Sequence, residues 1–310
     1  MAKAKRIKGI DCNDAAPTGI RLVLVTRFEE MFGFRQAALD WSDPEGVHSM
    51  RVASRRLRSA MRDFMPYLRQ RGLSPVLKHT KSIAAALGEV RDHDVAIIAL
   101  EKIEKHAPAE VSPALKQLVF DRTTLRSESR DKLFSALLAE HLHQVRLDFM
   151  ERIETATKLP RATGPRLSYS KMSAAVILDR LKEFEKLSDS LYKPFDIEPL
   201  HEMRIAAKRL RYALELFQQC WGGSLQTFAK SAARMQTALG ELHDCDVWID
   251  NVGKQINQER KQTQNDQVAA LMWLLSHFVK VRTKHLRQAY DLWCEWEVSD
   301  VSGQVRQAIR

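Results

Sequence analysis

The sequence predicts an all-α protein in which one helical unit occurs twice. Glycine and proline are sparse, at 12 and 10 of 310 residues, so long stretches contain no helix breaker. Residues 48–64 read HSMRVASRRLRSAMRDF and residues 201–217 read HEMRIAAKRLRYALELF, with nine of 17 positions identical at an offset of 153. Residues 84–95 read AAALGEVRDHDV and residues 236–247 read QTALGELHDCDV, with seven of 12 identical at an offset of 152. Because both motifs recur in the same order, we interpret the chain as an internal duplication.

The repeats divide the chain into halves that we expect to contain four helices each. Helices of the first half are expected at about 20–40, from Pro44 onward, at 74–105 and at 113–153. Their counterparts are expected at about 171–191, from 198 onward, at 224–255 and at 264–297. The predicted regions are a basic flexible N-terminus (1–18), a first four-helix half (19–157), a linker (158–170), a second four-helix half (171–298) and a C-terminal tail (299–310). We predict two four-helix bundles that pack about a pseudo-twofold axis.

Polar residues mark the expected starts of the two helices that carry the first motif. Ser42 or Asp43 is placed to cap the earlier helix, and Pro44 suits its first turn. Asp196 is the expected cap of the later helix. The linker between the halves is predicted from the proline and glycine residues of KLPRATGP at 158–165.

The first motif predicts a helix with its cations on one face. On a helical wheel they fall within a stripe of about 80°. The members of this first row are His48, Arg51, Arg55, Arg58 and Arg62. The expected core face lies nearly opposite and consists of Ala53, Leu57, Ala60, Met61 and Phe64. The second row consists of His201, Arg204, Lys208 and Arg211, and Glu215 replaces its last arginine, so this row is shorter and less positive.

Like charges three and four residues apart repel one another, so a stripe without acids is unfavourable on a solvated helix. One interpretation is that acids of neighbouring helices neutralise the rows. The other is that the rows bind a multiply charged anion, because the planar guanidinium group holds phosphate oxygens in pairs. Further cations could extend such a site, namely Lys78, Lys81, Lys230 and Arg234.

The second motif combines a glycine with clustered acids. Its acids are Glu89, Asp92, Glu241 and Asp244. Such carboxylates can hold Mg²⁺ or Ca²⁺, but we favour the interpretation that they pair with arginine and orient the rows, with no metal bound. Glycine inside a helix costs about 1 kcal/mol relative to alanine. Gly88 and Gly240 therefore predict that another helix approaches closely at these points.

The bulk composition indicates a polyanionic partner. The formal charge is +10, from 49 Lys and Arg against 39 Asp and Glu, and the pI is about 9.5. Such an excess favours polyanions through long-range attraction and counterion release. The N-terminus lacks the apolar segment of a secretory signal, and the four cysteines form no CxxC pair. We expect a cytoplasmic protein without a membrane span, cofactor or metal.

The sequence resembles the conserved-histidine α-helical domain (CHAD) family. The resemblance rests on HSMRVASRRLR at 48–58, HEMRIAAKRLRYALELF at 201–217, LGEVRDHDV at 87–95 and LGELHDCDV at 239–247, and it covers nearly the whole chain. It implies two pseudo-symmetric four-helix bundles with a central basic cavity or channel, binding of inorganic polyphosphate and association with bacterial polyphosphate granules. The positions that match the family's basic motif are His48, Arg51, Arg55, Arg58, His201, Arg204, Lys208 and Arg211. The ExExK strand of the triphosphate-tunnel domain that some members carry is absent, so the sequence resembles the stand-alone form.

We therefore predict non-catalytic binding of inorganic polyphosphate on granules of a bacterial cytoplasm, with granule-associated proteins as further partners. Nucleic acid is expected only as a non-specific competitor, because aromatic residues make up 7% of the chain and none alternates with the rows. A catalytic alternative uses His48 or His201 as phosphoacceptor or general acid, but no nucleophile–base pair or P-loop is evident. These histidines are open to three roles: a hydrogen bond to phosphate, protonation near neutral pH, or burial against a carboxylate.

Overall fold

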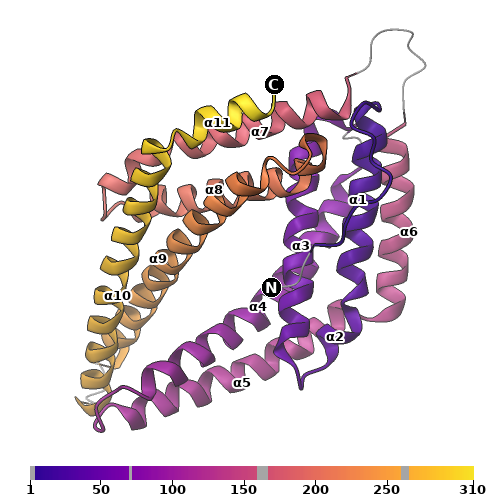
Figure 1. Ribbon diagram of the computed structural model, residues 1–310. Helices are drawn as coiled ribbons and strands as arrows, with labels where there is room; N and C mark the ends of the chain where they lie inside the picture. Colours follow the sequence, from indigo (N-terminus) through magenta and orange to yellow (C-terminus); the bar gives the residue numbers. More distant parts are fainter. Residues whose placement is uncertain (1–3, 70–71, 159–166, 260–264) are drawn as a thin grey trace. The chain divides into compact units, whose positions relative to one another are not determined.

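The computed structural model describes residues 4–69, 72–158, 167–259 and 265–310 (Figure 1). Helices dominate these ranges, whose β pairing is limited to an isolated bridge between Ala15 and Ser168. The predicted all-α class is confirmed. The chain divides into two compact units, Met1–Ala107 with Leu115–Met172 and Pro108–Ala114 with Ser173–Arg310.

The first unit packs its helices around α3, which carries the first row. The helices that begin up to residue 139 are α1 (Ala16–Gly33), α2 (Arg35–Leu39), α3 (Pro44–Phe64), the 3₁₀ helix η1 (Met65–Tyr67), α4 (Ser74–Glu104), α5 (Ser112–Ala136) and α6 (Ala139–Ala156). Helices α1, α2 and α4 all pack against α3, and α6 packs against α1 and α4 (Figure 1). Phe28 of α1 stacks on Phe149 of α6, with ring centroids 3.8 Å apart, and both side chains are fully buried.

The second unit centres on α9, which packs between the helix of the second row and the long α10. The remaining helices are α7 (Tyr169–Glu185), η2 (Ser188–Tyr192), α8 (Ile197–Phe217), η3 (Gln218–Trp221), α9 (Gln226–Glu259), α10 (Asn265–Val298) and α11 (Val301–Ala308). Helices α9 and α10 run side by side along their length (Figure 1). Phe184 of α7 meets Trp293 and Trp296 of α10 edge to face, with ring centroids 5.5 and 5.3 Å apart.

The two row helices begin where the sequence predicts, but only one has the predicted cap. The Asp43 carboxylate accepts a hydrogen bond from the Glu45 backbone N–H at 2.8 Å at the start of α3. Asp196 precedes α8, but its side chain makes no capping hydrogen bond. Pro199 occupies the third position of α8 and has no N–H, which removes one of the two donors that such a cap uses.

Two helices that were expected to be continuous are interrupted. The helix expected at 20–40 ends at Gly33 and resumes as α2 after Phe34, at a point weakened by the low helix propensity of glycine. The helix expected at 113–153 is divided into α5 and α6. The interruption buries the Leu137 side chain, and the Leu137 carbonyl accepts a hydrogen bond from Arg35 Nε at 2.8 Å.

The ends of the chain differ from the flexible N-terminus and the tail that the sequence suggested. Ile7 is buried, and the Tyr169 N–H donates to the Asp14 carbonyl at 2.8 Å, next to the bridge that joins the N-terminal segment to residue 168. Residues 301–308 form α11, which the Asp300 side chain caps at the Gly303 N–H. Most of the expected linker, at 159–166, lies outside the described residues.

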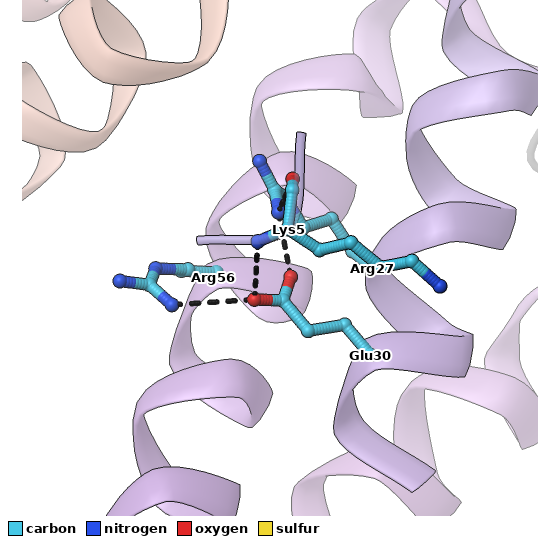
Figure 2. A network of polar contacts seen from close by, with 4 residues as sticks. All are labelled: Lys5, Arg27, Glu30 and Arg56. Atoms are coloured by element: carbon cyan, nitrogen blue, oxygen red, sulfur yellow. Dashed lines mark hydrogen bonds and ion pairs between the residues drawn. The ribbon is translucent and has the colours of Figure 1, made fainter. Parts of the chain in front are cut away.

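A buried network of charges fixes α3 against α1 (Figure 2). The Glu30 carboxylate, which is 4% exposed, accepts hydrogen bonds from Arg27 Nη1 at 2.6 Å and Arg56 Nη1 at 3.4 Å. It also accepts the backbone N–H of Lys5 at 2.8 Å, and the Lys5 carbonyl accepts from Arg27. The N-terminal segment thus completes the shell of this carboxylate.

The same arginine–glutamate–arginine arrangement recurs in the second unit. Glu183 of α7 accepts hydrogen bonds from Arg180, at 2.6 Å, and from Arg209 of α8. Each member lies 153 residues after its counterpart in the first unit. The duplication therefore extends to the first helix of each half and to the contact that positions the row helix.

Candidate functional site

Helix α3 presents its cations opposite a fully buried face. The predicted core residues of this helix are at most 2% exposed. Arg58 is exposed, whereas the other four members of the row are half-buried. Long cationic side chains bury their aliphatic stems in this way and keep their charged ends near water. The first row is thus a partly sheltered surface.

Arg51 is positioned by the LGE motif of α4. Its Nη2 donates a hydrogen bond to Asp92 Oδ1 at 3.0 Å. A Cβ atom at Gly88 would lie 2.7 Å from Arg51 Nη1, so glycine leaves room for the guanidinium group. The expected close approach at Gly88 therefore involves an arginine side chain, not a helix backbone. At Gly240 a Cβ atom would have nothing within 4 Å, and the expected close approach is wrong there.

The middle of the first row carries uncompensated charge. Within the described part of the chain, Arg55 and Arg58 have neither an ion pair nor a side-chain hydrogen bond. Lys81 of α4 is also exposed. Lys81 lies seven residues before Gly88, on the same face of α4 as the glycine that Arg51 contacts. These three cations are therefore candidates to contact an anion.

His48 begins the first row beside a second cation from α4. Burial and the neighbouring Arg91 guanidinium lower the pKa of His48, while Glu45 acts in the opposite direction. Arg91 was not predicted as a site residue. It occupies the variable position of the LGE motif, between Val90 and Asp92. The lowered pKa favours the neutral imidazole of His48 next to the permanent charge of Arg91.

The second row is shorter than the first. Arg204 and Lys208 are half-buried, like Arg55 of the first row. Arg211, which was predicted to belong to the site, is only 6% exposed. Its Nε lies 3.3 Å from Glu215 Oε1, and its guanidinium group stacks over Tyr212 at 4.8 Å. The glutamate that replaces the last arginine of the row therefore also neutralises Arg211.

A histidine pair heads the second row. His201 Nδ1 of α8 lies 3.0 Å from His243 Nδ1 of α9, and the ring centroids are 4.2 Å apart. Burial, followed by Arg204 and His201, lowers the pKa of His243 to about 4. Burial, followed by Arg204, also lowers the pKa of His201. His243 corresponds to Arg91 of the first unit at an offset of 152, so one variable position supplies the partner of both motif histidines.

The glutamates of the LGE motif contact the following helix. Glu89 accepts hydrogen bonds from Lys132 Nζ at 2.6 Å and Ser129 Oγ at 3.2 Å, both on α5. The hydrogen bond from Lys132 is the main cause that lowers the pKa of Glu89. Glu241 Oε2 lies 3.0 Å from His285 Nδ1 of α10. Among the four proposed supporting acids, Asp92 contacts the row cation Arg51, and Asp244 is exposed.

The second aspartate of the motif has a role that sequence reasoning missed. Asp94 is buried and lies 3.3 Å from Arg126 Nη1 of α5. Its counterpart Asp246 accepts a hydrogen bond from Arg282 Nε of α10 at 2.5 Å. The sequence contains a sign of this role, because the DxDV ending of the motif is identical in both copies. These pairs join the two long helices of each unit and hold the rest of the motif in place.

The remaining predicted cations lie away from the row helices. Lys78 lines a pocket of about 440 Å³ together with residues of α5 and α6. Arg234 pairs with Glu295 of α10 at 2.9 Å, and both side chains are exposed. Lys230 is exposed on α9. The structure therefore brings Lys81 to the face of α4 that meets α3, but it directs Lys78 and Arg234 toward other helices.

The chemistry that these residues offer is anion binding. In the ranges that the structure describes, no group of three or more His, Cys, Asp or Glu side chains is arranged to hold a metal ion. None of the described helices is long and apolar enough to cross a membrane. What the rows supply is guanidinium, ammonium and imidazole donors, which suit phosphate oxygens.

These features define a class of all-α proteins in which a duplicated helical unit presents a histidine-led cationic row on each copy. The chain belongs to the CHAD domain family, whose model matches residues 23–252. The crystal structure of the CHAD domain from the plant Ricinus communis is similar, with a TM-score of 0.72 and 23% identity over 98% of this chain and 94% of that chain. PptA from Streptomyces chartreusis has a TM-score of 0.65 and 13% identity over 90% of this chain and 99% of that chain. Both likenesses establish the fold, and no curated protein matches.

Proposed function

We propose that this protein binds inorganic polyphosphate through its two cationic rows without transforming it. The observation that carries the proposal is the pair Arg55 and Arg58, which has no counter-charge among the described residues and lies on a helix whose opposite face is fully buried. Unpaired arginines three residues apart destabilise a helix unless an anion lies between them. Arg204 and Lys208 of the second row lie half-buried on α8, and membership of the CHAD family supports the same ligand.

A linear polyphosphate suits this surface better than a compact phosphate does. Its charges follow one another along a flexible chain, as the cations follow one another along a helix. Neutralising successive phosphates releases counterions, so affinity increases with the number of contacts and decreases with added salt. Recognition of chain ends is not required, and we therefore expect longer polymers to bind more tightly.

Nucleic acid is the main alternative polyanion. Proteins that bind single strands combine a basic groove with aromatic platforms on which bases stack. The two row segments, residues 48–62 and 201–211, contain no aromatic side chain. We expect single-stranded DNA or RNA to displace polyphosphate only weakly at equal phosphate concentration. Displacement at equal or lower concentration would favour a nucleic-acid-binding protein.

Enzymatic turnover is the second alternative, with His48 or His201 as the reacting group. Neither histidine has a described carboxylate partner that would orient it as a general base, and none of the comparisons indicates an enzyme family. We expect incubation with polyphosphate to release no phosphate and a labelled phosphodonor to leave no phosphohistidine. Either product would contradict the non-catalytic assignment.

The test uses two variants that lose the same charge at different places. The row variant combines Arg55→Gln, Arg58→Gln, Arg204→Gln and Lys208→Gln. The control variant combines four exposed lysines outside the rows, Lys102→Gln, Lys105→Gln, Lys182→Gln and Lys186→Gln. Each charge-assisted hydrogen bond contributes about 1.5–3 kcal/mol, so we expect the row variant to lose affinity by about 100-fold or more. We expect the control to stay within a few-fold of the wild type. Equal losses would show that only net charge matters and would overturn the assignment.

We also propose that the protein associates with polyphosphate granules in the bacterial cytoplasm, where granule proteins are further partners. A granule provides a high local concentration of ligand, because it presents many polymer segments to both rows at once. A fluorescent fusion should form foci in cells that make polyphosphate and spread evenly in cells that do not. Foci that persist without the polymer would contradict this proposal.

A further inference from the structure

Protonation can change the number of hydrogen-bond donors that the histidine pair of the second unit offers to a ligand. Two neutral imidazoles joined through their Nδ1 atoms leave one Nε2–H donor and one Nε2 lone pair for other ligands. Addition of one proton leaves the hydrogen bond between His201 and His243 intact and turns the lone pair into a second donor. The 3.0 Å distance between the two Nδ1 atoms is consistent with either state. The pair is therefore suited to accept a proton when an anion needs two donors.

The charges around the pair come from several elements. The ionisable groups on α8 are Arg204, Lys208, Glu198 and Glu202. On α9, the acids next to His243 are Glu241 and Asp244. Helix α10 packs against α9 and contributes Arg282 and His285. The 3₁₀ helix η2 packs against α8 and contributes Asp189. Arg282 and His285 already contact Asp246 and Glu241, and Asp189 is exposed. Arg204 exerts the largest charge effect on both histidines, and an anion bound to Arg204 would offset it.

We propose that His201 and His243 form a phosphate subsite of the second row and that this subsite takes up a proton when polyphosphate binds. Arg91 gives the first unit a permanent charge at the position of His243, so the first row binds without this proton. The inference rests on the proposed function and identifies how that function depends on pH. It also adds His243, which lies outside the repeated identities of the sequence, to the binding residues.

The sign of the pH dependence follows from the two states of the pair. Burial and the row cations hold the pKa values of both histidines below the ordinary value, with that of His243 near 4, so the free pair is neutral at pH 7. A bound polyanion favours the charged form and raises the pKa of the pair. The proton is then bound more tightly in the complex than in the free protein. Affinity therefore decreases as pH rises through the pKa of the bound pair, by at most about tenfold per pH unit for one shared proton.

Reciprocal substitutions at the variable position test the inference. In His243→Arg the second unit acquires the permanent charge of the first, and in Arg91→His the first unit acquires the pair of the second. Titration calorimetry with long-chain sodium polyphosphate, in buffers of different ionisation enthalpy, counts the protons taken up at pH 6.5. We expect uptake by the wild type, its loss in His243→Arg and its increase in Arg91→His. At pH 8 His243→Arg should bind severalfold more tightly than the wild type, and Arg91→His more weakly.

The outcomes separate this inference from the function on which it rests. Tight binding of polyphosphate with no proton uptake by the wild type would overturn the inference and leave the proposed function intact. Undiminished uptake by His243→Arg would assign the proton to another group and would also overturn it. Absence of binding by the wild type would remove both. Because Arg91→His alters a different helix, a folding defect in one variant leaves the other as a valid test.

Discussion

At the scale of single residues, the two glycines of the LGE motif have different surroundings. A Cβ atom at Gly88 would meet the guanidinium group of Arg51, whereas one at Gly240 would meet nothing within 4 Å. Gly88 therefore serves the position of a row cation. Gly240 has no comparable contact, so it destabilises its helix through the conformational freedom of glycine and makes no compensating contact.

Alanine substitution at the two positions should give different results. Gly240→Ala should raise the free energy of unfolding by about 0.5–1 kcal/mol, because alanine restricts the unfolded chain and nothing obstructs its methyl group. Gly88→Ala should raise the free energy of unfolding by less than Gly240→Ala does. It should also weaken polyphosphate binding severalfold, because the methyl group displaces Arg51 from Asp92. Urea unfolding and a binding titration on both variants provide the measurements. Equal stabilities and equal affinities would contradict the role of Gly88.

The residue patterns predicted which face of a helix a side chain occupies better than they predicted its tertiary contacts. The wheel placed the core and cationic faces of α3 correctly, because both depend only on helix geometry. It could not reveal that Arg211 is only 6% exposed, since burial depends on the packing of surrounding elements. His243 and Arg91 were overlooked because the comparison of repeats gave weight to identical positions, and this position differs between the copies.

At the scale of elements, an arginine–glutamate–arginine contact holds each row helix against the first helix of its half. The two copies differ in burial, since the side chain of Glu30 is 4% exposed and that of Glu183 is 27% exposed. The N-terminal segment accounts for part of this difference, because the Lys5 backbone contacts Glu30. An ion pair that is cut off from water leaves a more costly charge behind when one partner is removed.

Neutralising the two glutamates should therefore cost different amounts of stability. We expect Glu30→Gln to lower the free energy of unfolding by about 3 kcal/mol, because two arginines lose a buried counter-charge. Glu183→Gln should cost about 1 kcal/mol, because water screens the charges that remain. Urea unfolding followed by far-ultraviolet circular dichroism measures both. A larger loss for Glu183→Gln would show that exposure does not decide the strength of these contacts.

Helix existence was predictable from the sequence, whereas two interruptions and the last helix were not predicted. The break at Phe34 has a local signal in Gly33, but the break at Leu137 and Leu138 has neither glycine nor proline. There, burial of Leu137 and the bond to Arg35 outweigh local preference. Helix α11 did have a signal, because Asp300 precedes apolar residues at four-residue spacing in Val301, Val305 and Ile309.

At the scale of the whole molecule, duplication explains why the same contacts recur about 150 residues apart. The glutamate networks recur at an offset of 153, and the buried Asp94 and Asp246 each contact an arginine of the next long helix. What differs between the copies lies on the rows themselves. The first copy keeps a longer row and a permanent charge at Arg91, while the second has a shorter row and a histidine pair. The scaffold is thus repeated, and the variation lies in how each copy presents its charge.

The central claim is that the row cations touch successive phosphates, and salt dependence tests it most directly. Polyphosphate affinity of the wild type, the row variant and the control variant should be measured over a range of sodium chloride concentrations. Each phosphate contact on a flexible strand contributes about 0.7 to the slope of log affinity against log salt, so loss of four contacts should reduce the slope by about 3. We predict this reduction for the row variant and an unchanged slope for the control variant. The same slope for all three proteins would contradict the claim.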